Sequence, residues 1–328
     1  MTVLEAIQKS ADFLGKKGVE SPRLQTELLL AHLLKLPRMK LYLNFERVLT
    51  TMETDALREF IKRRGQREPL QHIVGSTSFC GFEIVVNRHA LVPRPETELL
   101  AEAGWNFLAT CYSSPVTVLD FGTGAGCIAI ALAAKCPNAK IIALDVSAEA
   151  LVLAKENAVA NKLAERIEFL EGEGLAALSG ATERGRPARE LDNTNTRASR
   201  PRSFDLIISN PPYIPSAEIA TLQPEVRDFD PRTALDGGAD GLDFYRKFAV
   251  ESKPFLKPDG KIMLEFGDGQ ADAIKTIFEN EYWIVEAVKE DYSHRARILI
   301  AKSSSSSKMI EDEDEKEDED DKITWKVS

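Results

Sequence analysis

The 328-residue sequence has few of the side chains that bind metals or form disulfides. It contains four histidines at unrelated positions and four cysteines, none of which forms a Cys-x-x-Cys pair. Structural metal sites need closely spaced ligands, and disulfide-stabilised proteins need paired cysteines. We therefore expect reduced thiols and no metal site.

Long apolar runs are also missing. The longest run, Cys127 to Ala134, has eight residues, whereas a helix that crosses a bilayer needs about 20. Residues 1–10 have the pattern of an amphipathic helix and lack the apolar core of a secretion signal. We expect a soluble, cytoplasmic protein with no membrane partner.

The chain has no excess of positive charge. The net charge is −10, and the last 26 residues contribute ten acidic side chains against four lysines. Residues 1–75 are modestly basic, with 13 Lys and Arg against 9 Asp and Glu, so residues 76–302 are acidic. Because a nucleic-acid site is usually basic, this distribution predicts no direct nucleic-acid partner.

Helical periodicity dominates the first 75 residues. Apolar side chains recur at three- and four-residue intervals in Val3 to Leu14, Leu24 to Leu36 and Met52 to Ile61, which is typical of amphipathic helices. The pattern predicts a small helical bundle that ends near Gly75.

Two of these helices have recognisable starts. Ser21 followed by Pro22 is typical of an N-cap with proline in the first turn. Thr50 with Glu53 fits a capping box, in which each side chain bonds to the other residue's backbone N–H. We expect helices to begin at both positions.

A short hairpin and a loop come next. Residues Thr77 to Val86 alternate around Cys80 and Gly81, which favours a hairpin. The loop Leu91 to Pro95 follows it. We expect residues 76–93 to link the helical unit to the rest of the chain.

From Val116 onward, buried-type strands alternate with helices that begin near Ala125 and Ser147. Such alternation predicts an α/β domain, here residues 94–302, with a parallel sheet covered by helices on both faces. The expected strands are VTVLDF, IIALDV, IEFLEG, FDLIIS, KIMLEF and ARILIA.

Two segments have compositions that do not predict packed structure. Residues 179–203 contain six arginines and almost nothing apolar, so we expect a flexible surface insertion. Residues 303–328 combine a serine run with dense acidic charge. Because such a chain cannot bury enough apolar surface, we expect a disordered tail.

A glycine-rich turn follows the first strand of the α/β domain. Its spacing is Gly-x-Gly-x-Gly, preceded by an aspartate, whereas dinucleotide sites use Gly-x-Gly-x-x-Gly. The pattern resembles the S-adenosylmethionine loop of Rossmann-like methyltransferases, in which the acidic residue addresses the methionyl amine. The cofactor-binding residues predicted here are Asp120, Gly122, Thr123, Gly124, Ala125 and Gly126.

A second aspartate, Asp145, ends the next strand, 25 residues after Asp120. A carboxylate there can accept hydrogen bonds from both ribose hydroxyls, although two polar strand ends without a ligand would give the same pattern. In the methyltransferases that this region resembles, an acidic residue lies near the adenine. Glu173 has that place here, followed by Gly174 where relatives often have a bulky residue.

The tetrapeptide Asn210-Pro211-Pro212-Tyr213 follows strand FDLIIS. The two prolines stiffen the turn and hold its carbonyl groups outward as acceptors. The Asn210 side-chain oxygen and the Pro211 carbonyl can bind both N–H groups of a planar amide or amino nitrogen, and Tyr213 can pack against its plane. We predict Asn210, Pro211 and Tyr213 as catalytic, all four residues as substrate-binding, and Asn210 as a neighbour of the cofactor.

Four stretches together make a specific resemblance: residues 91–99 (LVPRPETEL), 120–126 (DFGTGAG), 210–213 (NPPY) and 230–242 (DPRTALDGGADGL). Over about residues 1–302 the chain is similar to the release factor glutamine methyltransferases, the HemK/PrmC family. The resemblance implies a class I methyltransferase with a mostly parallel seven-stranded sheet. It also implies transfer from S-adenosylmethionine to N5 of the glutamine in the Gly-Gly-Gln motif of class 1 release factors. The helical unit would then help to bind the factor, and we expect a monomer.

Three other functions remain open at this point. Ribosomal-protein glutamine methyltransferases share NPPY but usually differ after the Pro-Arg, so Pro95-Glu96-Thr97-Glu98 favours the release factor branch. An adenine or cytosine amino-methyltransferase would need a basic groove. A binding protein without activity would not need Asp120, Asp145 and NPPY together.

Several charged residues in the shared stretches have two interpretations. Arg94, Glu96 and Glu98 could orient a substrate or form internal salt bridges, and the same holds for Arg232 and Asp236. Phe121 stands where the family more often has an aliphatic residue. The insertion 179–203 and the acidic tail are the other two departures from the family pattern. None of the three affects the nitrogen-binding motif.

Overall fold

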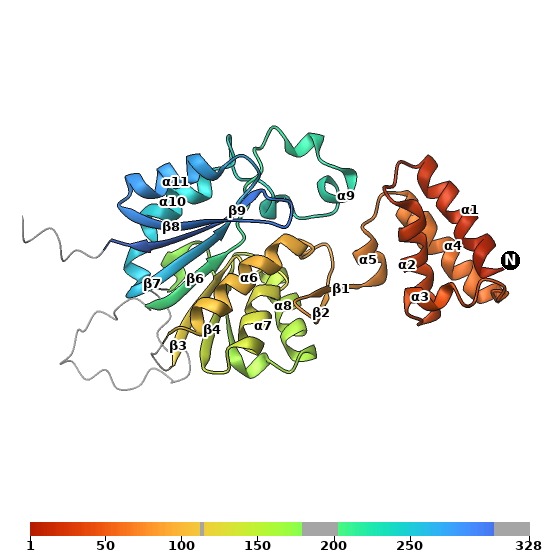
Figure 1. Cartoon of the computed structure of the whole chain (residues 1–328), viewed down its shortest axis with the longest axis horizontal. Helices are drawn as coiled ribbons and strands as arrows, with labels where there is room; N and C mark the ends of the chain where they lie inside the picture. Colours follow the sequence, from red (N-terminus) through yellow and green to blue (C-terminus); the bar gives the residue numbers. More distant parts are fainter. Residues whose placement is uncertain (112–114, 179–202, 305–328) are drawn as a thin grey trace, which may run out of the picture.

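The computed structural model describes residues 1–111, 115–178 and 203–304. A helical part and an α/β part are joined through a small hairpin (Figure 1). The predicted insertion 179–203 lies outside the described residues except for Ser203, and the predicted tail lies outside them beyond Ser304. Ser303, which we assigned to the tail, is the last residue of the final strand.

The helical part has an apolar core of its own. Its buried side chains include Leu14, Leu29, Leu30 and Leu57. Each longer helix therefore turns one apolar face inward, as the periodicity predicted. The helices are α1 (Val3–Lys16), α2 (Pro22–Leu34), α3 (Arg38–Leu41), α4 (Thr51–Gly65) and α5 (Leu70–Val74).

Both predicted helix starts are present, but only one of them has a side-chain cap. Thr50 and Glu53 form both bonds of the capping box, so that prediction is confirmed. Ser21 occupies the N-cap position before Pro22, but its side chain makes no cap hydrogen bond. Its φ of 47° is left-handed, whereas a capping serine usually has extended backbone. The predicted helix start is therefore confirmed, without a side-chain cap.

The predicted hairpin consists of β1 (Ser76–Phe79) and β2 (Phe82–Val85), which pair antiparallel. The fully buried Asn157 of helix α8 (Ala148–Ala160) attaches it to the α/β part. Its side chain exchanges two hydrogen bonds with the Val85 backbone and donates a third to the carbonyl of Ala125. The hairpin is thereby linked to the glycine-rich turn.

The α/β part is one sheet of seven strands in the order β5-β4-β3-β6-β7-β9-β8. Helices α6, α7 and α8 pack on one face and α10 and α11 on the other. The strands are β3 (Val116–Phe121), β4 (Ala139–Asp145), β5 (Ile167–Glu171), β6 (Phe204–Ser209), β7 (Leu256–Glu265), β8 (Trp283–Glu290) and β9 (Ala296–Ser303). The helices are α6 (Pro95–Leu108), α7 (Cys127–Lys135), α8 (Ala148–Ala160), α9 (Pro224–Arg227), α10 (Asp243–Glu251) and α11 (Ala271–Asn280).

The last two strands depart from the parallel arrangement. Strands β3 to β7 are parallel, but ARILIA, now β9, runs antiparallel to β7. The sequence interpretation missed β8, an edge strand that is mostly exposed. Because a tight connection joins β8 to β9, these strands must pair antiparallel, and β9 is inserted between β7 and β8.

Short 3-10 turns connect several of these elements. They are Ala164–Arg166, Leu175–Leu178, Ile219–Thr221, Arg232–Ala234 and Lys253–Phe255. In the part of the chain that the structure describes, no helix is both long and apolar enough to cross a membrane.

Candidate active site

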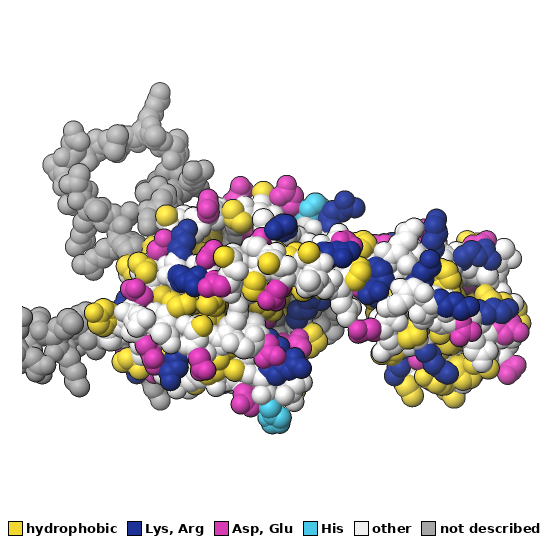
Figure 2. All heavy atoms as spheres, turned by 90° about the horizontal axis from the view of Figure 1, so that it is seen from above, with side chains coloured by type: hydrophobic (Ala, Val, Ile, Leu, Met, Phe, Trp, Pro, Cys, Tyr) yellow, Lys and Arg dark blue, Asp and Glu magenta, His cyan; other side chains and the backbone are white. Residues whose placement is uncertain are grey.

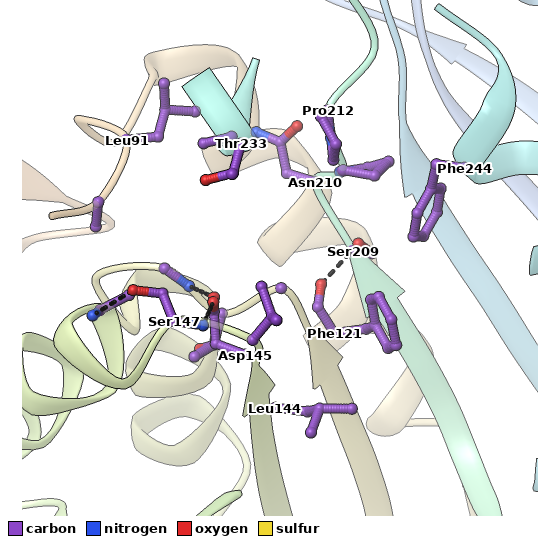
Figure 3. Close-up of a pocket in the computed structure, with 18 of the residues that line it drawn as sticks. Leu91, Phe121, Leu144, Asp145, Ser147, Ser209, Asn210, Pro212, Thr233 and Phe244 are labelled. Atoms are coloured by element: carbon purple, nitrogen blue, oxygen red, sulfur yellow. Dashed lines mark hydrogen bonds between the residues drawn. The ribbon is translucent and has the colours of Figure 1, made fainter. Parts of the chain in front are cut away.

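A cavity of about 420 Å³ opens where the parallel strands end, a common position for ligand sites in α/β sheets. Its lining comes from the ends of β3, β4 and β6, the start of α10 and the loop before α6. Figure 3 shows Asp145 and Ser147 on one side, with Asn210 and Pro212 opposite. We call residues 120–126 with 145–147 the glycine-loop side, and residues 209–212 with Thr97 and Glu265 the Asn210 side.

The glycine turn has a backbone that other residues rarely adopt. Gly126, with a φ of 81°, is the N-cap of α7, and a Cβ there would lie 3.0 Å from the Cβ of Ala154. The backbone N–H groups of Gly122 and Thr123 both donate to the carbonyl of Leu144, at 2.8 and 3.0 Å. Backbone contacts to β4 and α8 therefore fix the turn against the cavity.

Asp120 lies beneath the turn and does not line the cavity. Its Oδ2 accepts from the Thr123 hydroxyl at 2.6 Å and from the Ala129 N–H at 3.0 Å. Its Oδ1 is buried and has no partner among the described residues. Burial raises the pKa of this carboxyl to about 7. These contacts stabilise the turn, while a direct contact with a ligand amine stays a prediction.

Asp145 does line the cavity. Its Oδ2 accepts from the Gly124 N–H at 2.8 Å, and its Oδ1 accepts from the Ser147 N–H at 2.9 Å. The Ser147 hydroxyl in turn caps α8 through the Ala150 N–H. The carboxylate is thus held in one orientation, with further lone pairs available to hydroxyl groups of a ligand.

The end of the cavity near β5 contains Glu173 and Gly174, as predicted for the adenine region. Glu173 is exposed, and Gly174 leaves the wall open. Aromatic rings supply a wall instead: Phe244 and Phe248 stack at 5.0 Å, and Phe121 lies 5.6 Å from Phe244. All three line the cavity. Phe121, which departs from the family pattern, is therefore part of this aromatic cluster.

The Asn210 side starts where β6 ends. The Ser209 hydroxyl donates to the carbonyl of Phe121 at 2.7 Å, which couples the ends of β6 and β3 (Figure 3). The next three residues, Asn210, Pro211 and Pro212, line the cavity. They therefore line the same cavity as the glycine turn.

Tyr213 is not among the residues that line the cavity. Its carbonyl accepts from Nε2 of Gln270 at 2.9 Å, and a Cβ on Gly241 would come within 2.3 Å of the same oxygen. Burial raises the pKa of its phenol to about 12. The glycines of the 230–242 stretch thus allow the chain to pass close against Tyr213, whose contact with a substrate stays a prediction.

Two residues of the Asn210 side were missed by the sequence interpretation. Thr97 of α6 is buried, and its Oγ1 accepts from Nδ2 of Asn210 at 2.9 Å. Glu265 ends β7, beside the end of β6. The side chains of Thr97 and Asn210 lower the pKa of its carboxyl against the effect of burial, and its Oε2 is buried without a hydrogen-bond partner among the described residues. Thr97 belongs to the quoted 91–99 stretch, and a carboxylate that directly follows buried strand KIML was an available signal for Glu265.

The loop before α6 is tied to the 230–242 stretch. Arg94 donates to Oδ2 of the buried Asp230 at 2.7 Å. Burial raises the pKa of Asp230, although Arg94 opposes the shift. Arg94, Pro231 and Thr233 all line the cavity mouth. The internal salt bridge is therefore the interpretation of Arg94 that the structure supports.

The other charged residues with two interpretations differ in their contacts. Glu98 accepts from the Cys80 N–H at 2.9 Å, which ties α6 to the hairpin turn. Arg232 pairs with Asp236 at 3.1 Å on the surface. Glu96 is exposed. Within the described ranges, no three His, Cys, Asp or Glu side chains gather where they could hold a metal ion.

The helical part contacts the loop that contains α9. Arg64 and Arg67 of the helical part both donate to the Glu225 carboxylate, at 2.6 Å for each closest contact. Arg64 is buried. Because the same loop continues to Pro231 and Thr233 at the cavity mouth, this ion-pair cluster connects the helical part with the Asn210 side.

The chain is similar to known proteins over most of its length. Residues 5–75 match the PrmC N-terminal domain, and residues 101–184 match the methyltransferase small domain. A release factor glutamine methyltransferase of Geobacter sulfurreducens is 39% identical over 84% of this chain and 88% of its own. Proteins with the same name from Chlorobaculum tepidum and Rhodospirillum rubrum are 40% and 41% identical, over 89% and 87% of this chain and 94% and 80% of theirs.

Proposed function

Because the chain belongs to the family of release factor glutamine methyltransferases, we propose that it methylates a release factor glutamine, with S-adenosylmethionine as the methyl donor. The target is the side-chain amide nitrogen of the glutamine in the Gly-Gly-Gln motif of a class 1 release factor. The observation that carries the proposal is one cavity lined by Asn210, Pro211, Asp145 and the glycine turn, in which Asn210 lies opposite Asp145 (Figure 3).

The glycine-loop side fits the methyl donor. The whole cavity, of which it forms one side, has a volume of about 420 Å³, within the range of about 300–1,000 Å³ for small-molecule sites. Asp145, already oriented by Gly124 and Ser147, would accept hydrogen bonds from the ribose hydroxyls. The ring cluster of Phe121, Phe244 and Phe248 would supply apolar contacts at the adenine end.

The Asn210 side fits the amide. An amide nitrogen is a poor nucleophile because its lone pair is delocalised, so orientation matters more than deprotonation. Asn210 Oδ1 and the Pro211 carbonyl would accept the two N–H groups and aim the nitrogen along the cavity. Fixed acceptors also stabilise the positive charge that develops on nitrogen during transfer.

The bound donor supplies a methyl group on a positively charged sulfur. The nitrogen gains that methyl carbon, the sulfur keeps the electron pair of the broken bond, and the nitrogen releases one proton to solvent. Arg94 and Asp230, which join two loops at the cavity mouth, would restrict water there. No strong general base is required, because the proton becomes acidic only as the methyl group arrives.

The substrate should be a glutamine on an exposed loop flanked by glycines. Only a slim backbone can bring a short side chain to a site walled by Pro211, Pro212 and the loop before α6. The helical part, anchored through Glu225, would add a second contact surface on the factor. Binding energy there can assist positioning at the reacting nitrogen.

The decisive experiment is mass spectrometry of a purified class 1 release factor after incubation with the enzyme and S-adenosylmethionine. We expect one added methyl group on the glutamine of the Gly-Gly-Gln loop. A factor with alanine in place of that glutamine is the matched control and should gain none. An unmodified factor, together with methyl transfer to adenine in DNA or RNA, would show that the proposal is wrong.

Surface charge agrees with a protein substrate. On the face seen in Figure 2, basic and acidic side chains are interspersed over the α/β part. A groove for nucleic acid would gather basic side chains along one path.

A further inference from the structure

The Asn210 amide can serve the proposed reaction in only one of its two flip states. Its oxygen must face the substrate nitrogen, because an NH₂ group in that place would repel the substrate's own N–H groups. An asparagine side chain can rotate between these states. What fixes the amide orientation is therefore part of the catalytic arrangement.

Two side chains from other elements contact this amide. Nδ2 of Asn210 donates to Oγ1 of Thr97 at 2.9 Å. Glu265 follows Leu264, the β7 partner of Ser209, and its carboxyl interacts with both side chains, which lower its pKa against the effect of burial. Thr97 and Glu265 are each 2% exposed. The three groups come from α6, the end of β6 and the end of β7, so they meet only in the folded protein.

The donors and acceptors of the three groups determine which flip state of the Asn210 amide is favoured. A hydroxyl can donate or accept, so Thr97 alone would tolerate either flip state of Asn210. Above its pKa of about 7, Glu265 is an ionised carboxylate that only accepts, so it can accept the hydrogen bond of the Thr97 hydroxyl and leave the Thr97 lone pairs for Asn210. Both acceptors then face Nδ2. Within the described residues no donor is recorded on Oδ1 of Asn210, which leaves this oxygen for a substrate.

We propose that Glu265, acting with Thr97, is a positioning residue that holds the Asn210 amide with its oxygen toward the substrate nitrogen. This role rests on the proposed function, because the orientation of the amide matters only if Asn210 binds the substrate nitrogen. The observation behind it is the hydrogen bond between Asn210 and Thr97. Other groups around Glu265 are the acidic Glu96 of α6 and the cationic Arg297 of β9. The phenols of Tyr213 and Tyr245 also interact with it.

The first test is a pair of substitutions at Thr97. Thr97→Val keeps the shape and removes the hydroxyl, so we expect kcat to fall about tenfold while KM for the factor changes little. Thr97→Ser restores a hydroxyl and should recover most of the lost turnover. Thr276→Val makes the same atomic change at an exposed hydroxyl of α11 and should leave kcat unchanged.

A double-mutant cycle separates positioning from a general structural effect. If Thr97 acts through Asn210, Thr97→Val should have no further effect on kcat in the Asn210→Ala background. If Thr97→Val does not fold, Glu265→Gln replaces it in the cycle. Glu265→Gln should likewise have no further effect on kcat in the Asn210→Ala background. Wild-type kcat in both single variants, or equal losses in both backgrounds, would overturn the inference.

A measurement without turnover keeps the inference distinct from the proposed function. The side-chain amide signal of Asn210 in ¹⁵N NMR, assigned by its loss in Asn210→Ala, should move in Thr97→Val and Glu265→Gln. It should stay near its wild-type position in Thr276→Val. If wild-type enzyme leaves the release factor unmodified, the proposed function fails while this signal still tests the cluster. If the Asn210 signal does not move in Thr97→Val and Glu265→Gln, the positioning role is wrong even if the factor is methylated.

Discussion

The two sides of the cavity are built from different kinds of contact. On the glycine-loop side, the Gly124 N–H donates to the Asp145 carboxylate, and the two residues are 21 positions apart in the chain. On the Asn210 side, the bond between Asn210 and Thr97 spans 113 residues. The first side is a local strand-turn-helix unit with its neighbouring strand, and the second depends on three distant elements. We therefore expect ligand binding and chemistry to respond separately to substitution.

The largest expected effect comes from Asn210→Ala. The substitution removes an acceptor from the Asn210 side as charge develops on nitrogen, so kcat should fall by roughly a hundredfold or more. Affinity for S-adenosylmethionine, measured by calorimetry, should stay close to wild type. A matching loss of cofactor affinity would show that the two sides are not independent.

A pH series compares one buried carboxyl from each side. Burial raises the pKa of Asp120 from 3.8 to about 7 and that of Glu265 from 4.5 to about 7. The folded state therefore keeps protons that the unfolded chain has already released, so stability falls as pH rises from about 4 to 7. Each group should account for a loss of the order of 3 kcal/mol.

Urea unfolding at a series of pH values measures this loss. Asp120→Asn and Glu265→Gln should each flatten the fall in stability, and the two effects should add, because the carboxyls belong to different sides. If wild type, Asp120→Asn and Glu265→Gln all show the same dependence of stability on pH, both shifts are contradicted.

Asp145→Ala tests the glycine-loop side alone. Losing charged acceptors for a buried ribose should weaken binding of S-adenosylmethionine by about 1–3 kcal/mol. At saturating cofactor, kcat should change little. Asp55→Ala, on the exposed surface of α4, is the matched control for calorimetry. Unchanged affinity in Asp145→Ala would remove Asp145 from the proposed site.

The same contrast explains what the sequence could predict. The glycine turn and Asp145 were predictable because both belong to one strand-turn-helix-strand unit, β3 to β4, and spacing within such a unit fixes where they lie. Five parallel strands followed from the alternation of strands and helices. The direction of β9 did not, because it depends on β8, whose exposed, alternating residues give a weak pattern.

The Asn210 side was predictable only in part. The stiff Asn-Pro-Pro turn identified Asn210, Pro211 and Pro212, which line the cavity. Tyr213 was assigned to the same motif but is not among the residues that line the cavity. Its carbonyl accepts from Gln270 and lies close to Gly241, both far along the chain. Thr97 and Glu265 were missed for the same reason. A motif gives the residue types, whereas tertiary contacts decide which of them face the cavity.

The smallest expected effect concerns the link between the helical part and the Asn210 side. Glu225 accepts from Arg64 and Arg67, and the loop that carries it continues to Pro231 and Thr233 at the cavity mouth. Glu225→Gln weakens these ion pairs without removing the side chain, so KM for an intact release factor should rise about three- to tenfold. Cofactor affinity should not change, because the glycine-loop side has its own contacts.

An isolated Gly-Gly-Gln loop peptide is the informative control for this substitution. The peptide is too short to contact the helical part, so its kcat/KM should be the same with wild-type enzyme and with Glu225→Gln. Asp228→Asn, which alters an exposed ion pair of the same loop, should leave both substrates unaffected. If Glu225→Gln impairs the peptide as strongly as the intact factor, the ion-pair cluster acts on the cavity mouth itself. The helical part would then stabilise the Asn210 side without contributing a surface for the factor.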